Sequence, residues 1–232
     1  MTTLVLIPGL VSDAIVWQAV AEAAPLPAHH ADVTRDDSIT AMAERVLSET
    51  DGELIVVGHS MGGRVALEMA RIAPERVRGL VLANTGHGPR REAELPKRYE
   101  MIALGHKDMG ELADVWLPPM MHPDRSGNDP QLVARLKEMV LRAGPDVHER
   151  QIRALIGRPN ATAYLPEIRC PILLLTGRQD GWSPVAQHQE IADAVPDAEL
   201  AIIEDAGHFA PVEQPEAVTS RIVEWLQRRF GY

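Results

Sequence analysis

Residues 54–63 read LIVVGHSMGG, and this stretch decides the fold that the sequence predicts. The apolar run 54–57 is typical of a buried strand. The residues after it match Gly-x-Ser-x-Gly around Ser60, and residues 61–72 have the composition of a helix. A strand, a sharp turn and a helix in this order hold a serine hydroxyl clear of the edge of a sheet. We therefore expect Ser60 to be a nucleophile.

The two glycines of this turn have a physical reason. A side chain at Gly58 or Gly62 would collide with neighbouring backbone, so a strained turn at Ser60 needs glycine on both sides. The helix that begins at Met61 directs its free N–H groups and its positive end toward the serine, where they would stabilise a negative oxygen. The alternative is a glycine-rich turn in which Ser60 only caps the helix.

Strands and helices alternate along most of the chain. Further strands are expected over residues 4–7, 29–34, 79–83, 172–176 and 200–203, and further helices over 15–24, 39–50 and 215–230. This alternation predicts an α/β fold with a parallel sheet of about six strands and helices on both faces.

The alternation stops between the third and fourth clear strands. Residues 87–164 contain helical segments, over 92–104, 110–116, 131–142 and 147–156, but no strand-like run. We interpret 87–164 as a helical lid or cap over the carboxyl ends of the strands, inserted into a core formed by 1–86 and 165–232. The alternative is that these helices pack on the edge of the sheet.

A serine hydroxyl needs a general base, and His208 is the best candidate. It lies in a loop just after the strand 200–203, and sites of open parallel sheets lie at the carboxyl ends of strands. Asp180 follows the strand 172–176 in the same way and would orient the imidazole and stabilise its charged form. Asp205 is the rival acid, although a turn or capping role suits its place after the last strand better.

The other histidines are weaker candidates for the base. We expect His87 to enter the pocket as a secondary group, His59 to be turned into packing and His188 to lie on a helix. The remaining five are expected to be solvated, in loops or lid helices: His29, His30, His106, His122 and His148.

A tetrahedral intermediate needs two N–H donors, each worth roughly 3 kcal/mol of barrier. One is expected from the backbone of Met61, directly after the nucleophile. The second is expected from the loop after the first strand, with Leu10 as the candidate and Val11 next, because Gly9 lets the backbone approach closely. Val11, together with His87 and Trp182, is a candidate for the lining of the substrate pocket.

With these pieces placed, the chain resembles the α/β-hydrolase superfamily, especially its small esterase-like and lyase-like members. The residues that carry the resemblance are Pro8-Gly9 with Trp17, GHSMGG at 58–63, PERV at 74–77, Gly177 with Asp180 and Pro184, AGHF at 206–209 and EQP at 213–215. They cover roughly 1–86 and 165–232, and the order Ser60, Asp180, His208 is the order of that family.

The chain departs from the family pattern in its first part. It has Pro8-Gly9 where members usually have His-Gly, and its first strand corresponds to the third of the usual eight, so six strands are expected. A serine nucleophile speaks against the dehalogenase and epoxide hydrolase branches, in which that residue is aspartate.

The resemblance and the candidate residues favour hydrolysis of a carboxylic ester through an acyl-enzyme. Few aromatic residues and a modest insertion suggest a small or medium acyl substrate. A lyase or carbon–carbon hydrolase with the same three residues stays open, with Arg64, His87 or Arg178 binding a carboxylate or oxygen substituent. A ligand receptor on the same fold also stays open.

Composition excludes other classes of function. The 232 residues carry a net charge of −10, which argues against nucleic acid as a partner, and no apolar stretch is long enough to span a membrane. Cys170 is the sole cysteine, so no intrachain disulfide forms. We expect a cytoplasmic enzyme with a small-molecule ester substrate, no cofactor and no metal, and the sequence leaves the oligomeric state open.

Overall fold

A computed structural model describes residues 1–232, apart from the side chain of Ser126. Its strands are β1 Thr2–Ile7, β2 Ala28–His30, β3 Glu53–His59, β4 Val77–Ala83, β5 Ile172–Gly177 and β6 Ala198–Ile203. They form one sheet in the order β2-β1-β3-β4-β5-β6, and every neighbouring pair is parallel. The predicted parallel sheet of six strands is confirmed.

The central strands carry continuous apolar runs because both faces of the sheet are covered. Every residue of β5 and all of β3 after Glu53 are buried, as is usual for parallel strands. The strand expected over 29–34 is shorter and begins earlier, at Ala28. It ends because the Asp32 carboxylate accepts a hydrogen bond from Thr34 N at 3.0 Å, which closes a turn.

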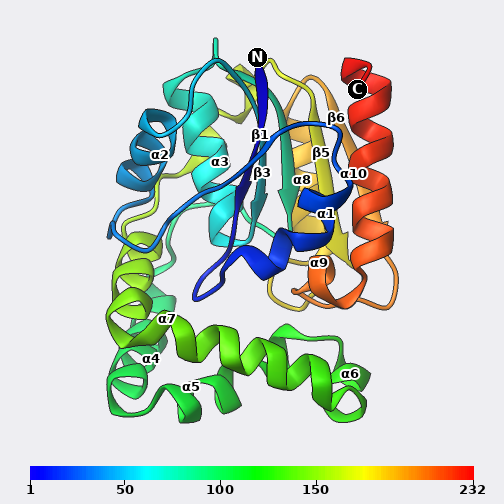
Figure 1. Ribbon diagram of the computed structural model, residues 1–232. Coiled ribbons are helices and arrows are strands. Elements are labelled where there is room, and N and C mark those ends of the chain that lie inside the picture. Colours follow the sequence, from blue (N-terminus) through cyan, green and yellow to red (C-terminus); the bar gives the residue numbers. More distant parts are fainter.

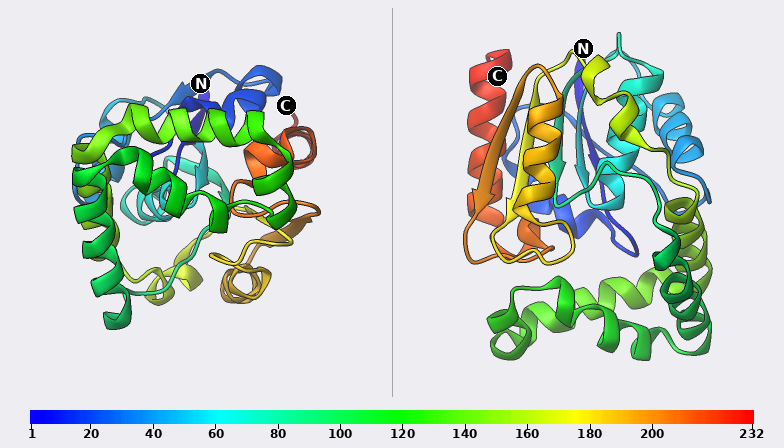
Figure 2. Two further views of the ribbon diagram at one scale, coloured as in Figure 1. Left: turned by 90° about the horizontal axis from the view of Figure 1, so that it is seen from below. Right: turned by 180° about the vertical axis from the view of Figure 1, so that it is seen from behind.

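Helices lie on both faces of the sheet, as predicted (Figures 1 and 2). The core helices are α1 Gln18–Ala23, α2 Ile39–Ser48, α3 Met61–Ile72, α8 Val185–Ala194, α9 Ala210–Glu213 and α10 Pro215–Phe230. The helices α1 and α10 pack together on one face, and α2, α3 and α8 cover the other.

Between β4 and β5 the described chain forms four α-helices, which are α4 Leu95–Lys107, α5 Met109–Trp116, α6 Pro123–Asn128 and α7 Pro130–Ile156. They lie beyond the carboxyl ends of the strands (Figure 1), and α7 packs against α4 and α5. The sequence predicts two helices where α7 stands. A kink separates its halves, because Gly144 takes φ 74° just before Pro145.

Among the described residues, the structure contains no helix whose length and apolar character would let it cross a membrane.

Candidate functional site

The turn between β3 and α3 holds Ser60 in a strained backbone conformation. Its φ of 54° and ψ of −113° lie in the positive-φ region that residues with a side chain rarely adopt. The turn fits because its glycines have no Cβ. A Cβ at Gly62 would lie 2.4 Å from the Ile7 carbonyl oxygen, and one at Gly58 would lie 2.3 Å from the Gly62 carbonyl oxygen. The Ser60 side chain is half-buried beyond the carboxyl end of β3.

The neighbouring strand β4 supports this turn. Ser60 N donates to Ala83 O at 2.9 Å, and Thr85 Oγ1 donates to Ser60 O at 2.6 Å. His188 of α8 accepts a hydrogen bond at Nε2 from Thr85 N at 3.1 Å. Burial lowers the pKa of His188 to about 4, so its ring stays neutral at neutral pH and keeps that acceptor.

His208 lies in the loop after β6 and reaches Ser60. Its Nε2 is 2.8 Å from Ser60 Oγ, and its Nδ1 is 2.9 Å from Asp180 Oδ2. When Nδ1 carries the proton and donates a hydrogen bond to the carboxylate, Nε2 is unprotonated and can accept the proton of the serine hydroxyl. The backbone of this loop is held by the insertion, because His208 N donates to Met120 O at 2.7 Å.

Asp180 follows β5 and is almost fully buried, yet both carboxylate oxygens are bonded. Its Oδ1 accepts hydrogen bonds from Trp182 N and Ser183 N, each at 2.8 Å. Its Oδ2 accepts from His208 and, at 2.9 Å, from Asn84 Nδ2. Burial alone would raise the pKa of Asp180, but the charge of His208 and these hydrogen bonds together lower it below its usual value. Asp180 is therefore ionised beside the imidazole.

Asn84 is a member of this cluster that the sequence did not reveal. It directly follows β4 with φ 50°, which asparagine tolerates better than most residues. Its Nδ2 donates to Asp180 and also to Gly207 O at 3.1 Å. Its place at the end of a strand, like that of Asp180 and His208, is the signal that could have found it.

The rival acid, Asp205, lies in a turn with φ 53°. The acid that reaches the Nδ1 of His208 is Asp180. The backbone carbonyl of Asp205 accepts a hydrogen bond from Gln214 Nε2 at 3.1 Å, which fits a turn residue.

His59 packs behind His208. Its Nε2 donates to the His208 carbonyl oxygen at 2.7 Å, and its ring stacks on Phe209 with 5.5 Å between ring centroids. Burial and the nearby charge of His208 lower the pKa of His59 to about 3, so it is neutral. The structure thus places His59 in packing, as the sequence predicts.

The loop after β1 brings two candidate oxyanion donors toward the serine. A Cβ at Gly9 would lie 3.2 Å from Ser60 Cβ, so the backbone beside Leu10 lies against the turn. Among the described residues, neither Leu10 N nor Met61 N donates a hydrogen bond to the protein. Val11 N, the other candidate, already donates to Gln151 Oε1 at 2.7 Å.

The residues suggested for the pocket have different surroundings. The Val11 side chain is 1% exposed and belongs to the core, whereas Trp182 is 54% exposed. His87 is buried, with Nε2 3.8 Å from Glu190 Oε2, and burial lowers its pKa. Of the groups considered for a carboxylate substrate, Arg64 donates to Gly88 O at 3.0 Å and Arg178 pairs with Glu204.

One expectation about the remaining histidines is wrong. His148 was expected to be solvated but is 2% exposed, because α7 packs against α4, where a Cβ at Gly105 would lie 2.7 Å from its Nδ1. Burial lowers the pKa of His148 to about 4.

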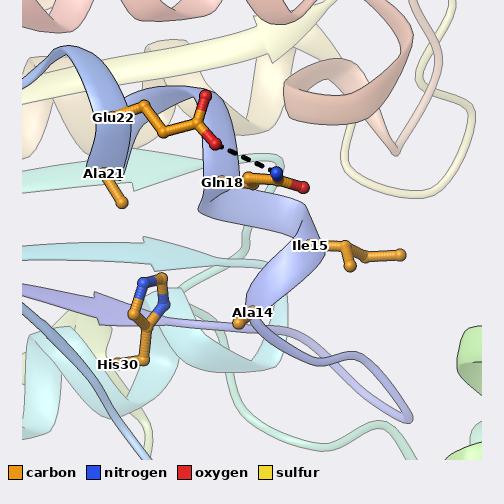
Figure 3. Close-up of a pocket in the computed structure, with 6 residues that line it drawn as sticks. All are labelled: Ala14, Ile15, Gln18, Ala21, Glu22 and His30. Carbon is orange, nitrogen blue, oxygen red and sulfur yellow. Dashed lines mark hydrogen bonds between the residues drawn. The ribbon is translucent and has the colours of Figure 1, made fainter.

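A hollow of about 230 Å³ whose lining does not include Ser60 lies beside α1 and β2 (Figure 3). It is lined by Ala14, Ile15, Gln18, Ala21, Glu22 and His30. Gln18 Nε2 and Glu22 Oε1 are hydrogen-bonded to each other at 3.0 Å, and the lining contains no serine or cysteine. This hollow offers no nucleophile, so the cluster around Ser60 is the better candidate site.

The match to a known family agrees with this geometry. A model of the alpha/beta hydrolase family matches residues 4–221. The chain belongs to the α/β-hydrolase family. The resemblance seen in the sequence is thereby confirmed, and this chain forms the fold with a parallel sheet of six strands and helices on both faces.

Relatives within the α/β hydrolases cover most of the chain. A poly(3-hydroxyalkanoate) depolymerase of Ectopseudomonas oleovorans is 29% identical over 84% of this chain and 68% of its own. A pimeloyl-[acyl-carrier protein] methyl ester esterase of Nitrosomonas europaea is 28% identical over 94% of this chain and 92% of its own. The structure of a thermophilic esterase from Thermogutta terrifontis superposes with a TM-score of 0.89 at 27% identity, over 98% of this chain and 90% of that one.

Proposed function

We propose that this α/β hydrolase is a serine esterase that cleaves a small or medium carboxylic ester through an acyl-enzyme intermediate. The observation that carries the proposal is the continuous chain of hydrogen bonds from Ser60 Oγ to His208 Nε2 at 2.8 Å and from His208 Nδ1 to Asp180 at 2.9 Å. The names of two relatives, a methyl ester esterase and a thermophilic esterase, support ester substrates.

Each group has one task in the proposed reaction. Ser60 Oγ attacks the ester carbonyl carbon while its proton passes to His208 Nε2, and Asp180 stabilises the imidazolium that forms. The carbonyl oxygen becomes negative and is held by the N–H groups of Leu10 and Met61. The imidazolium then protonates the departing alkoxide, and the acyl group stays on Ser60.

Water completes the cycle in the same geometry. His208 takes a proton from a water molecule as that water attacks the acyl carbon. The second tetrahedral intermediate collapses to the free carboxylic acid, and the proton returns from His208 to Ser60 Oγ. We assign no cofactor to any of these steps.

The proposal is tested by treating the protein with a fluorophosphonate and measuring its intact mass. We expect one adduct on the wild-type protein, none on Ser60→Ala, and one on Ser48→Ala, a matched control on the exposed end of α2. A series of p-nitrophenyl esters of increasing chain length then gives kcat/KM, and we expect turnover to favour short and medium acyl groups and to vanish in Ser60→Ala.

The other outcomes separate the alternatives that the sequence left open. Labelling of Ser60 without turnover of any ester would favour a lyase or carbon–carbon hydrolase with the same three residues. Turnover that stops near one equivalent while the ligand is retained would favour a receptor. Full ester hydrolysis by Ser60→Ala would contradict the assignment of the nucleophile.

A further inference from the structure

Gln151 connects the inserted helix α7 to the loop after β1, which carries the proposed oxyanion donor Leu10, and to the segment after β2. It lies in the second half of α7, after the kink at Gly144, and is fully buried. Its Oε1 accepts from Val11 N at 2.7 Å, and its Nε2 donates to Val33 O at 3.0 Å. Both polar ends of this buried amide therefore bond to backbone from outside the insertion, and Gln151 and Val11 are 140 positions apart in the sequence.

The residue that Gln151 holds is itself strained. Val11 has φ 45°, which is unfavourable for a β-branched side chain, and such a conformation costs on the order of 1–3 kcal/mol unless its surroundings hold it in place. The loop is short, since Ser12 N donates to Gly9 O at 3.3 Å across it. A hydrogen bond to Val11 N therefore fixes the peptide between Leu10 and Val11 within a four-residue turn.

The same hydrogen bond decides which N–H group can serve the reaction. Val11 N is occupied by Gln151, whereas the preceding N–H, that of Leu10, has no acceptor among the described residues. Fixing the peptide after Leu10 restricts the rotation of the Leu10 backbone, and with it the direction of the Leu10 N–H. An oxyanion donor works only when it is held in place before the charge develops.

We propose that Gln151 is a positioning residue for the oxyanion site, so that helix α7 of the insertion completes the catalytic geometry of the core. This inference rests on the proposed esterase function. It assigns the insertion a part in catalysis that differs from covering the substrate. Gln151 holds the backbone of the loop after β1 and does not contact the substrate in this proposal.

A positioning role and a purely structural role give different kinetics. Loss of an interaction that matters only when the oxyanion forms lowers kcat and leaves KM nearly unchanged, whereas a loosened fold lowers the melting temperature without that pattern. A small displacement of a catalytic donor can cost up to about 100-fold in rate. We therefore expect a fall of about 10- to 100-fold in kcat when Gln151 loses its polar end.

The test compares Gln151→Met, which keeps a similar length without hydrogen bonds, with Leu155→Ala, a buried control one turn further along α7. Measured are kcat and KM for the best p-nitrophenyl ester, the rate of fluorophosphonate labelling of Ser60, and the melting temperature. We expect Gln151→Met to lower kcat and the labelling rate with little change in KM. Leu155→Ala is expected to lower the melting temperature with kcat retained.

Gln151→Glu provides a second variant if Gln151→Met does not fold. Its carboxyl group still accepts from Val11 N and, when protonated, donates to Val33 O, so we expect it to recover part of kcat, and more of it relative to wild type at acidic pH. Equal kcat in wild type and both Gln151 variants would overturn the inference while leaving the esterase proposal intact. Wild-type protein that is neither labelled nor active would overturn the esterase proposal itself, and the inference with it.

Discussion

Asn84 joins the carboxylate of Asp180 to the loop that carries His208. Replacing its amide by a carboxylate in Asn84→Asp changes almost no volume but puts a second negative oxygen where Nδ2 now lies 2.9 Å from Asp180 Oδ2. When both carboxylates are ionised they repel each other, and the new oxygen has no hydrogen to donate to Asp180 or to Gly207 O, so Asp180 is pushed away from the imidazole that it orients. We expect kcat at neutral pH to fall about tenfold or more, because a loss of about 1.4 kcal/mol of transition-state stabilisation lowers the rate tenfold.

The pH dependence of that loss checks its cause. When the new carboxyl group is protonated it can donate to Asp180 as the amide did, so the ratio of Asn84→Asp to wild-type kcat should rise as the pH is lowered. Asn160→Asp is the matched control, because Asn160 is exposed and its side-chain oxygen only caps a short turn. A ratio independent of pH would contradict the electrostatic explanation.

At the scale of elements, Glu213 ties the insertion to the loop of His208. This carboxylate is 3% exposed and accepts hydrogen bonds from Gly207 N at 3.0 Å and from His122 N at 2.7 Å. In Glu213→Gln one of these N–H groups would face an amide NH₂ and lose its acceptor. Leaving a buried donor unsatisfied costs about 1–3 kcal/mol.

We expect Glu213→Gln to lower both the melting temperature and kcat, because the loop that it loosens carries His208. Thermal unfolding and ester kinetics measure the two effects. Glu216→Gln, an exposed change at the start of α10, is the control and should alter neither. If both variants behaved alike, the hydrogen bonds of Glu213 between the insertion and the His208 loop would contribute nothing to stability or catalysis.

These contacts mark the boundary of what the sequence could predict. The sheet and the approach of Ser60, Asp180 and His208 follow from local patterns, because each of the three residues lies in the turn or loop after a strand and parallel strands end at the same edge. Gln151 and Glu213 gave no such signal. Their partners depend on how the inserted helices dock against the core, which the spacing of apolar residues within one helix does not encode.

At the scale of the whole molecule, stability should depend on three buried histidines. Burial lowers the pKa of His59 to about 3 and those of His148 and His188 to about 4, from 6.5. The unfolded chain therefore binds up to three more protons than the folded one below about pH 6.5, and the free energy of unfolding falls as the pH falls. Burial also lowers the pKa of His87, which acts in the same direction, whereas Glu213 opposes the effect by at most one proton because burial raises its pKa.

The net effect is at least about two protons, so the free energy of unfolding falls by roughly 3 kcal/mol or more per pH unit between about pH 6 and about pH 5. Urea unfolding at a series of pH values measures it. His148→Leu removes one of these groups, and because its Nδ1 has no hydrogen-bond partner among the described residues, the substitution breaks no hydrogen bond of that atom. We expect the variant to reduce the slope by about 1.4 kcal/mol per pH unit. A wild-type free energy of unfolding that stays constant over this range would mean that the folded and unfolded chains bind the same number of protons. Burial of the histidines would then not control the acid stability of the protein.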